Sequence, residues 1–506
     1  MKIQVHGVLL FLAIAALILT AGCTGTEYDS KASTGNADNL YSQAQYEMKN
    51  DNYKTASSLY EEAWNAYKKH NDSKKALAAR NGMFLAERAA VEFPFNRTEA
   101  AENMKSKIPG ITDSEIGDWL ENSAQKIKSG GETLYFAGIS QYYLYKNFKI
   151  LQNMDILDFG SIPGYAITDE STPDSGKNNP YINPIRYTGS EKLEVQKDLL
   201  PKNGTLKIWF PLPVETDSQR NVSVRNLSYP EYVVKEPVTT GDIGYIYYEI
   251  PAEKIDGNLT IAADIKFTSY EQRFIVDPER VEAYNKSSPE YIKYTASERN
   301  IEISGDIRDK AKKIVGNETN PYLMAQLIYD YITTTYPYSH APHVNLDTVE
   351  PKTPESTYMF ETGHGDCGTQ SILFSALCRA VGIPARAIGG YQMLISGEPG
   401  THFWAEYYIE GYGWVPCDIT VADVADWVNT SDEKRDEFKK YYSSNLDPTR
   451  YIIQKNVDAE MSPEFSPDAV ALRIVRQTPA IVCDTAVNDL DLLAEDYFTV
   501  DLKPEE

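Results

Sequence analysis

Cys367, in the last third of the chain, stands in a context that suits a nucleophile. It lies in the glycine-punctuated segment 363–370, which leads directly into the apolar stretch 371–380. This pattern predicts a helix that begins at Cys367, where the positive end of the helix dipole favours thiolate over thiol. Gly365 and Gly368 on either side would let a substrate approach the sulfur closely. A lone cysteine is more often an inert buried residue, so the assignment depends on partners.

A histidine and an aspartate further along the chain supply such partners. His402 stands near the start of an expected strand, 401–409, and a glycine turn at 410–413 sends the chain back toward Asp418. If Asp418 pairs with Trp404, the imidazole and the carboxylate share one face of this hairpin. A register one residue away would put them on opposite faces. The first register requires a loop of three or five residues, or a bulge.

The order Cys367, His402, Asp418 is embedded in several separated motifs that resemble the transglutaminase-like core of the papain-like fold. The resemblance covers residues 323–420, about a fifth of the chain, and several separated elements occur in order. The motifs are Gly365-x-Cys367-Gly368, Gly382-Ile383-Pro384-Ala385-Arg386, Gly389-Gly390-Tyr391, His402-x-Trp404-x-Glu406 and Trp414-x-x-x-Asp418-x-Thr420.

This resemblance implies a thiol enzyme that acts on amides. Cys367 would attack a carboxamide carbon, His402 would deprotonate the thiol and protonate the departing amine, and Asp418 would orient the imidazole. The backbone N–H of Cys367 and, from its place upstream, Tyr338 would stabilise the oxyanion. No cofactor and no metal site are predicted, and the sequence does not predict whether a metal activates the enzyme. Transamidation, peptide hydrolysis and N-glycan removal all suit these residues, and hydrolysis is favoured for an exported protein in water.

Two other interpretations stay open. His340, His343 and His364 with Cys367 offer nitrogen and sulfur ligands for a zinc site, although their spacing matches no common finger pattern. Alternatively, the fold is retained in a non-catalytic surface module that binds a partner, and an unreactive Cys367 would favour this alternative. The remaining cysteines of the chain's second half are interpreted as structural: Cys378, Cys417 and Cys483.

The elements that position these residues are expected in a core domain over residues 277–425. Apolar spacing predicts helices over 307–314 and 320–336. A C-terminal extension, 426–506, is expected to pack on this core. Upstream, residues 191–276 alternate with a period of two, which predicts an antiparallel β-sandwich of structural or substrate-orienting role. The clearest alternation is Leu259, Ile261, Ala263, Ile265 and Phe267.

The first half of the chain is expected to be helical. Residues 39–154 have helical periodicity, and the segment 40–63 resembles one tetratricopeptide-like hairpin with its turn at 50–52. Such units stack to bury their faces, so a generic bundle and an array that binds a protein partner are both open. A helix pair broken at Gly130-Gly131 is expected within 116–144. The segment 155–190, rich in proline, glycine and asparagine, is expected to be a linker.

The N-terminus has the pattern of an exported, anchored protein. Residues 1–22 read as a signal peptide, and the following Cys23 resembles the lipidated cysteine of prokaryotic lipoproteins. Thr20 departs from that motif, which usually has leucine there, and the alternative is an ordinary signal peptide with an incidental cysteine. The segment 23–38 would be a polar tether. We therefore expect a membrane-anchored protein on the outer face of the cytoplasmic membrane or the cell surface.

Composition excludes several classes of protein. The 506 residues are 42% hydrophobic and 24% charged, near the average for globular proteins. The net charge of -24 would repel phosphate backbones, so nucleic acid is not expected as a partner. Five cysteines are too few for a disulfide scaffold. An excess of N-x-S/T sequons suggests a glycoprotein and would suit an archaeal host; they lie at Asn71, Asn96, Asn203, Asn221, Asn226, Asn258, Asn285, Asn317 and Asn429.

Together these patterns predict a multidomain α+β protein. A tetratricopeptide-like helical region would precede an antiparallel β-sandwich and a papain-like transglutaminase core. The expected partners are a protein or peptide substrate, the membrane through a lipid anchor, and a protein bound by the N-terminal helices. The sequence does not predict the oligomeric state.

Overall fold

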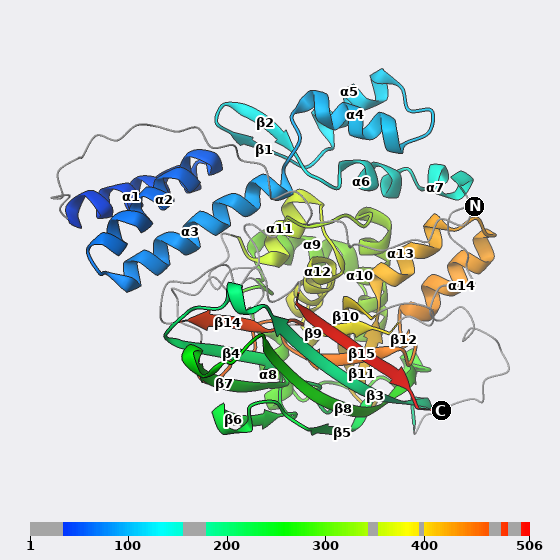
Figure 1. Cartoon of the computed structure of the whole chain (residues 1–506). Coiled ribbons are helices and arrows are strands. Elements are labelled where there is room, and N and C mark those ends of the chain that lie inside the picture. The colour runs from blue at the N-terminus through cyan, green and yellow to red at the C-terminus, as the bar shows by residue number, and fades with distance from the viewer. Residues whose placement is uncertain are drawn as a thin grey trace.

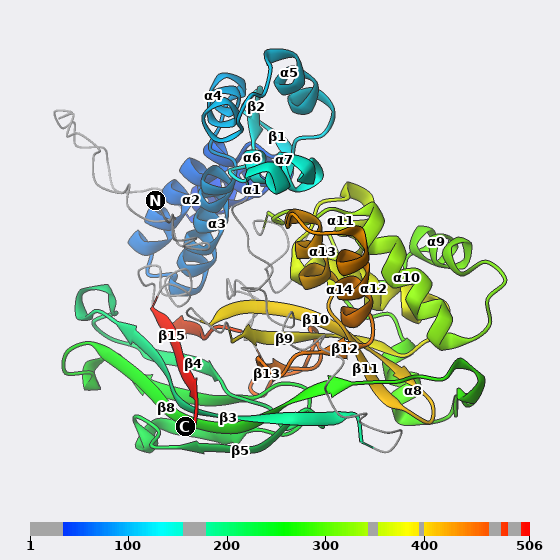
Figure 2. The ribbon, with the colours of Figure 1, turned by 90° about the vertical axis from the view of Figure 1, so that its right-hand side faces the viewer.

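The computed structural model describes residues 34–154, 179–342, 353–393, 399–464, 477–483 and 497–505. The expected signal peptide, Cys23 and most of the tether lie outside these ranges, as does His343. Within them, no helix combines the length and the apolar character needed to cross a membrane. The helices α1 to α7 lie on one side of the molecule, α9 to α14 lie in the middle, and the larger sheets lie on the other side with α8 (Figures 1 and 2).

The N-terminal region is mainly helical, as predicted, and α1 and α2 form the expected hairpin around residues 50–52. A tetratricopeptide-like array is not confirmed. The expected helix pair within 116–144 is wrong in part, because Gly130 and Gly131 adopt positive φ and turn a short β-hairpin between two helices. The elements are α1 (Thr34–Lys49), α2 (Tyr53–Lys69), α3 (Ser73–Glu92), α4 (Arg97–Lys107), α5 (Asp113–Asn122), β1 (Lys126–Ser129), β2 (Glu132–Tyr135), α6 (Ile139–Lys146) and α7 (Phe148–Met154).

Two antiparallel sheets pack face to face over one apolar core. Strand β8 has the predicted alternation, since Leu259, Ile261 and Ile265 are fully buried while Asp264 is exposed. One sheet has the order β12-β8-β3-β15 with β5 also on β8, and the other β14-β4-β7-β6. The strands of these two sheets are β3 (Tyr181–Val195), β4 (Thr205–Pro211), β5 (Gln219–Arg225), β6 (Val233–Val238), β7 (Tyr245–Pro251), β8 (Leu259–Arg273), β12 (Asn445–Leu446), β14 (Ala480–Cys483) and β15 (Phe498–Pro504).

Two expected boundaries differ from the structure. Strand β3 begins at Tyr181, inside the expected linker, because a shift in register between Ile182 and Ile185 accommodates Pro184 within the strand. The residues after 425 are expected to pack on the core domain, and part of them do: Phe438 and Tyr442 lie in its hydrophobic cluster, and residues 450–454 pair with a strand of its sheet. The strands β12, β14 and β15 instead lie at edges of the two sandwich sheets.

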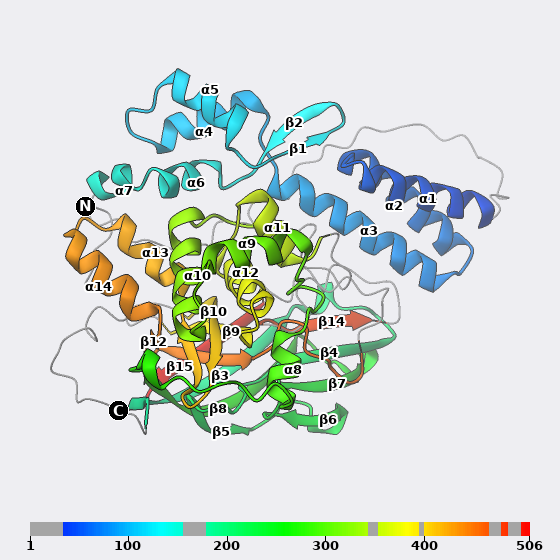
Figure 3. The same ribbon diagram turned by 180° about the vertical axis from the view of Figure 1, so that it is seen from behind.

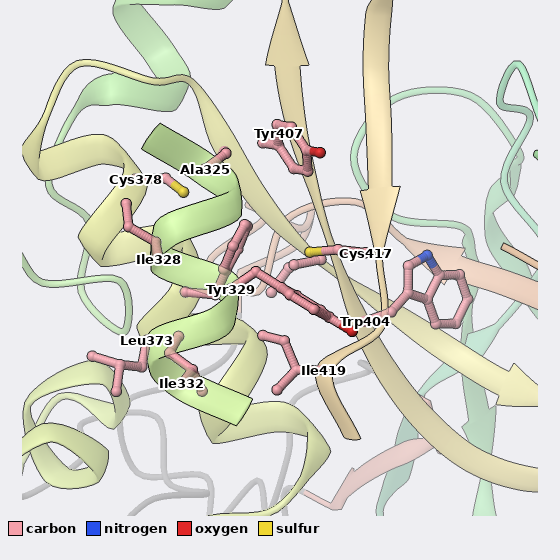
Figure 4. Close-up of a cluster of buried hydrophobic side chains, with 14 of the residues drawn as sticks. Ala325, Ile328, Tyr329, Ile332, Leu373, Cys378, Trp404, Tyr407, Cys417 and Ile419 are labelled. Atoms are coloured by element: carbon pink, nitrogen blue, oxygen red, sulfur yellow. The ribbon is translucent and has the colours of Figure 1, made fainter. Parts of the chain in front are cut away.

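The third large sheet, β11-β10-β9-β13, separates a helical layer from the sandwich. Helices α10 and α12 pack on it around Tyr329 and Tyr407, and α9 packs against these two helices (Figures 3 and 4). Tyr391 and Tyr451 extend into the sandwich core. The elements are α8 (Pro289–Thr295), α9 (Gly305–Val315), α10 (Pro321–Thr335), α11 (Glu355–Thr362), α12 (Cys367–Ala380), β9 (Ala385–Gln392), β10 (Gly400–Ile409), β11 (Gly413–Cys417), α13 (Ile419–Trp427), α14 (Asp432–Tyr442) and β13 (Arg450–Gln454).

A buried carboxyl group joins the sandwich to this third sheet. Glu191 of β3 is fully buried, and its Oε1 accepts a 2.8 Å hydrogen bond from the Tyr451 hydroxyl of β13. Burial raises the pKa of Glu191 to about 8, although the Tyr451 hydrogen bond opposes this shift. The unfolded chain releases this proton near the ordinary pKa of 4.5, so the folded state loses stability as pH rises from about 4.5 to 8.

Replacement of Glu191 by glutamine is expected to remove this pH dependence. The difference in free energy of unfolding, wild type minus Glu191→Gln, should fall by up to ~1.4 kcal/mol per pH unit between about pH 4.5 and 8. Urea denaturation at pH 5 and pH 8 measures the difference. Glu253→Gln, on an exposed residue, is the matched control. Equal pH slopes for wild type and Glu191→Gln would contradict the assignment.

Candidate active site

Cys367 is the first residue of α12, as predicted. The Asp366 carboxylate caps the helix by accepting from the backbone N–H groups of Gly368 at 3.0 Å and Thr369 at 3.1 Å. Across the described residues, the backbone N–H of Cys367 donates to no acceptor. The cysteine is partly exposed, whereas most of the helix behind it is buried. A sulfur and an unused N–H are therefore presented together at the positive end of a helix.

The two glycines beside the cysteine have different surroundings. A Cβ on Gly365 would lie 2.2 Å from the Met359 sulfur, so this glycine is required for packing beneath the start of the helix. A Cβ on Gly368 would meet Phe403 only at ordinary contact distance. Gly365 therefore has a packing role, and its expected role in substrate access stays a prediction.

His402 and Asp418 meet across the β10–β11 hairpin. Ala405 pairs with Cys417 and a three-residue loop joins the strands, which confirms the register that places Asp418 next to Trp404. His402 Nε2 lies 2.8 Å from Asp418 Oδ2. Asp418 is fully buried, and its Oδ1 also accepts from the Val421 N–H at 3.0 Å as the N-cap of α13. The carboxylate is thus fixed by both of its oxygens.

The charges of the site stabilise a protonated imidazole. Burial lowers the pKa of His402, but the Asp418 carboxylate and the hydrogen bond with Cys367 outweigh it and raise this pKa to about 9. Burial raises the pKa of Asp418, but His402 and Arg450 hold it well below its usual range. Since Nε2 is bound to Asp418, Nδ1 is the ring nitrogen left for the thiol.

Arg450, at the start of β13, completes the site on the side away from Cys367. Its Nη1 donates to Asp418 Oδ2 at 2.6 Å. Sequence reasoning missed this residue, which lies 32 positions after Asp418 and outside the recognised motifs. The available signal was a charged residue directly before the apolar run 451–453, where a buried arginine needs a buried carboxylate.

Tyr338, the predicted oxyanion donor, lies in an aromatic cluster between the N-terminal helices and the core. Its ring centroid is 5.7 Å from that of Tyr145 on α6 and 6.0 Å from that of Trp427 on α13. Tyr145 and Trp427 stack at 4.3 Å. The role of Tyr338 toward an oxyanion stays a prediction.

The N-terminal helices reach the loop that precedes the nucleophile. His364 Nε2 lies 3.2 Å from the carbonyl oxygen of Ser123, and its ring is 4.8 Å from that of Tyr142 on α6. Burial lowers the pKa of His364, and the Ser123 hydrogen bond opposes the shift. Gln152 of α7 donates to the Asp426 carbonyl at 2.7 Å. The helical region therefore contacts segments that carry or adjoin Cys367 and Asp418.

The alternative zinc site gains no support from the described residues. No group of three or more histidine, cysteine, aspartate or glutamate side chains in them is arranged to hold a metal ion. His340 and His364 instead contact aromatic rings, and His343 lies outside the described ranges. Cys378, Cys417 and Cys483 are buried, in agreement with structural roles.

Comparison with known proteins identifies a family for part of the chain. Residues 308–419 match the model of the transglutaminase-like superfamily. An uncharacterized protein of Haemophilus influenzae is 23% identical over 304 residues, covering 53% of this chain and 80% of that protein.

Two solved structures share part of the chain at low similarity. A protein from Cytophaga hutchinsonii described as a candidate cysteine protease aligns at 17% identity and a TM-score of 0.36, covering 57% of this chain and 96% of that one. The periplasmic domain of TgpA from Pseudomonas aeruginosa aligns at 14% identity and a TM-score of 0.25, covering 52% and 94%. The family-model match carries the assignment: residues 308–419 of this chain form a domain of the transglutaminase-like superfamily.

Proposed function

We propose that this protein is a thiol enzyme that cleaves carboxamide or peptide bonds through Cys367, His402 and Asp418. The observation that carries the proposal is the 2.8 Å contact of His402 Nε2 with Asp418, with Cys367 hydrogen-bonded to the same imidazole. A nucleophile, a base and a group that orients the base are then present in one place. The family of residues 308–419 supports the same chemistry.

The first half of the reaction forms a thioester. The Cys367 sulfur bonds to the amide carbon, and its proton resides on His402. The carbonyl oxygen gains negative charge next to the backbone N–H of Cys367, with Tyr338 as the proposed second donor. The C–N bond then breaks as the imidazolium gives its proton to the leaving nitrogen. The raised pKa of His402, about 9, suits this acid step at neutral pH.

The second half releases the acyl group. His402 accepts a proton from water as the oxygen bonds to the thioester carbon, and the C–S bond breaks to regenerate Cys367. Water as the acceptor makes the enzyme a hydrolase of protein or peptide substrates, which we favour for a protein exposed to solvent. A primary amine as the acceptor makes it a transglutaminase. Because both reactions use the same thioester, a test of Cys367 precedes a test of the acceptor.

Export and lipid anchoring at Cys23 belong to the same proposal and rest on residues 1–23 alone. The N-terminal helices are proposed to bind a protein partner or the substrate, because they adjoin the segments around Cys367. The alternative to an enzyme is a surface binding module that retains the fold.

Iodoacetamide labelling separates the enzyme from the binding module. In the chain without residues 1–23, Cys367 should react at pH 6 at least ~10-fold faster in wild type than in His402→Ala, because the imidazolium stabilises the thiolate. Peptide mass spectrometry reads the labelling of each cysteine. Buried Cys378 and Cys483 in the same molecule are internal controls. A Cys367 no more reactive than these two in folded protein would favour the binding module.

A further inference from the structure

We infer that Arg450 is a positioning residue for the proposed reaction, acting through Asp418 and held in turn by Asp447. This inference rests on the proposed function and deepens it. Arg450 lies beyond residues 308–419, the part of the chain that matches the family model. The carboxylate that orients His402 is thus itself oriented by a strand from outside the matched segment.

The Arg450 guanidinium lies between two buried carboxylates. Nη1 donates to Asp418 Oδ2 at 2.6 Å, the same oxygen that contacts His402 Nε2. Nη2 donates to Asp447 Oδ2 at 2.6 Å, and Nε lies 3.2 Å from that oxygen. Only 2% of the arginine side chain is exposed, and both carboxylates are fully buried. Charge-assisted bonds in such surroundings are short and directional.

Asp447 is held independently of the active site. Its Oδ2 accepts from the Tyr442 hydroxyl at 3.0 Å, and its Oδ1 accepts from the backbone N–H and hydroxyl of Thr449. The backbone N–H of Asp418 also donates to the Tyr442 carbonyl at 2.9 Å. Asp447 therefore anchors Arg450 to the segment after α14, and Arg450 transmits this fixed position to Asp418.

One aromatic ring lies against both the histidine and the arginine. Trp404 is fully buried, its ring stacks at 6.2 Å from that of His402, and the guanidinium carbon of Arg450 lies 5.3 Å from its centre. His402, Asp418, Arg450 and Asp447 form a row of alternating charge when the imidazole is protonated. A row of this kind leaves no buried charge without a partner and fixes the direction of the Asp418 oxygen that meets His402.

Arg450→Lys is expected to keep only part of the arginine's effect, because one ammonium group lacks the planar fork that donates to both carboxylates at once. Methionine alone would leave Asp447 buried without its cation, so the informative variant is Arg450→Met with Asp447→Asn. Its kcat is expected to fall about 10–100-fold with little change in KM, as for other residues that orient a reactive group without touching substrate. Arg450→Lys should recover part of this loss.

A spectroscopic readout tests the inference without a substrate. Proton NMR should show a downfield imidazole N–H resonance of His402, which is assigned by its absence in His402→Gln. This resonance should move upfield in Arg450→Met/Asp447→Asn. Arg379→Met is the matched control, since Arg379 is a buried arginine of α12 that donates to Glu298 and to backbone carbonyls. This control should leave the resonance in place.

The outcomes distinguish the inference from the proposed function. If His402→Ala slows labelling of Cys367 but the folded double variant keeps wild-type kcat and the wild-type resonance, Arg450 is structural and the inference is wrong. If His402→Ala leaves labelling unchanged, the proposed function fails first. If the double variant does not fold, Arg450→Lys is compared with wild type by the same resonance, and an unchanged signal overturns the inference.

Discussion

Replacement of Cys367 by serine is expected to lower kcat/KM for amide substrates by at least ~10⁴-fold, because loss of a nucleophile leaves only binding and oxyanion stabilisation. The serine hydroxyl is a far weaker nucleophile than a thiolate beside His402. Ammonia release from glutamine-containing peptides measures carboxamide hydrolysis, and cleavage of labelled casein measures peptide hydrolysis. Incorporation of a fluorescent amine measures transamidation.

Cys378→Ala is the matched control for this experiment. Cys378 lies on the same helix, is fully buried, and belongs to the hydrophobic cluster behind the site. Its activity should stay near that of wild type. Trapping at low pH should also give an acyl adduct on the Cys367 peptide of wild type and of Cys378→Ala, but not on the corresponding peptide of Cys367→Ser. Activity that survives in Cys367→Ser would show that another group performs the chemistry.

The second large effect is expected on stability, from Gly390→Ala. A Cβ at this position of β9 would lie 1.8 Å from the carbonyl oxygen of Tyr451 in β13. A backbone clash of this kind is relieved only when the two strands separate, so the cost should exceed about 3 kcal/mol. Separation would also draw Arg450, the first residue of β13, away from Asp418.

Gly400→Ala is the matched control. Gly400 lies on the neighbouring strand β10, and a Cβ there meets nothing within 4 Å. Chemical denaturation of both variants measures the difference. The His402 resonance should also be lost in any Gly390→Ala protein that folds. Similar stabilities of the two variants would contradict the close approach of β9 and β13.

The parts of the site that the sequence predicts are those determined by neighbouring residues. A helix that starts at Cys367 follows from Asp366 as a cap and from the apolar run behind it. The pairing of His402 with Asp418 follows from one hairpin whose loop length sets the register. Both signals are local, so they are readable without a structure.

The contacts that the sequence does not predict join distant segments. Arg450 reaches Asp418 because β13 pairs with β9 across about 60 intervening positions, and residue spacing carries no signal for that pairing. The contact of Ser123 with His364 spans 241 positions. The hairpin at Gly130-Gly131 was missed for another reason, since four-residue polar strands have too short an alternation to distinguish them from helix.

The pairing of β15 with β3 has a consequence for how the chain is made. Lys192 and Thr499 lie side by side in this sheet but are 307 positions apart. A ribosome must therefore synthesise the chain through residue 504 before β3 gains this neighbour, and until then the backbone groups along this edge of β3 lack their strand partner and are open to aggregation. Strand β14 closes the other sheet equally late. Chains that terminate before residue 498 are thus expected to be substrates for chaperones and proteases.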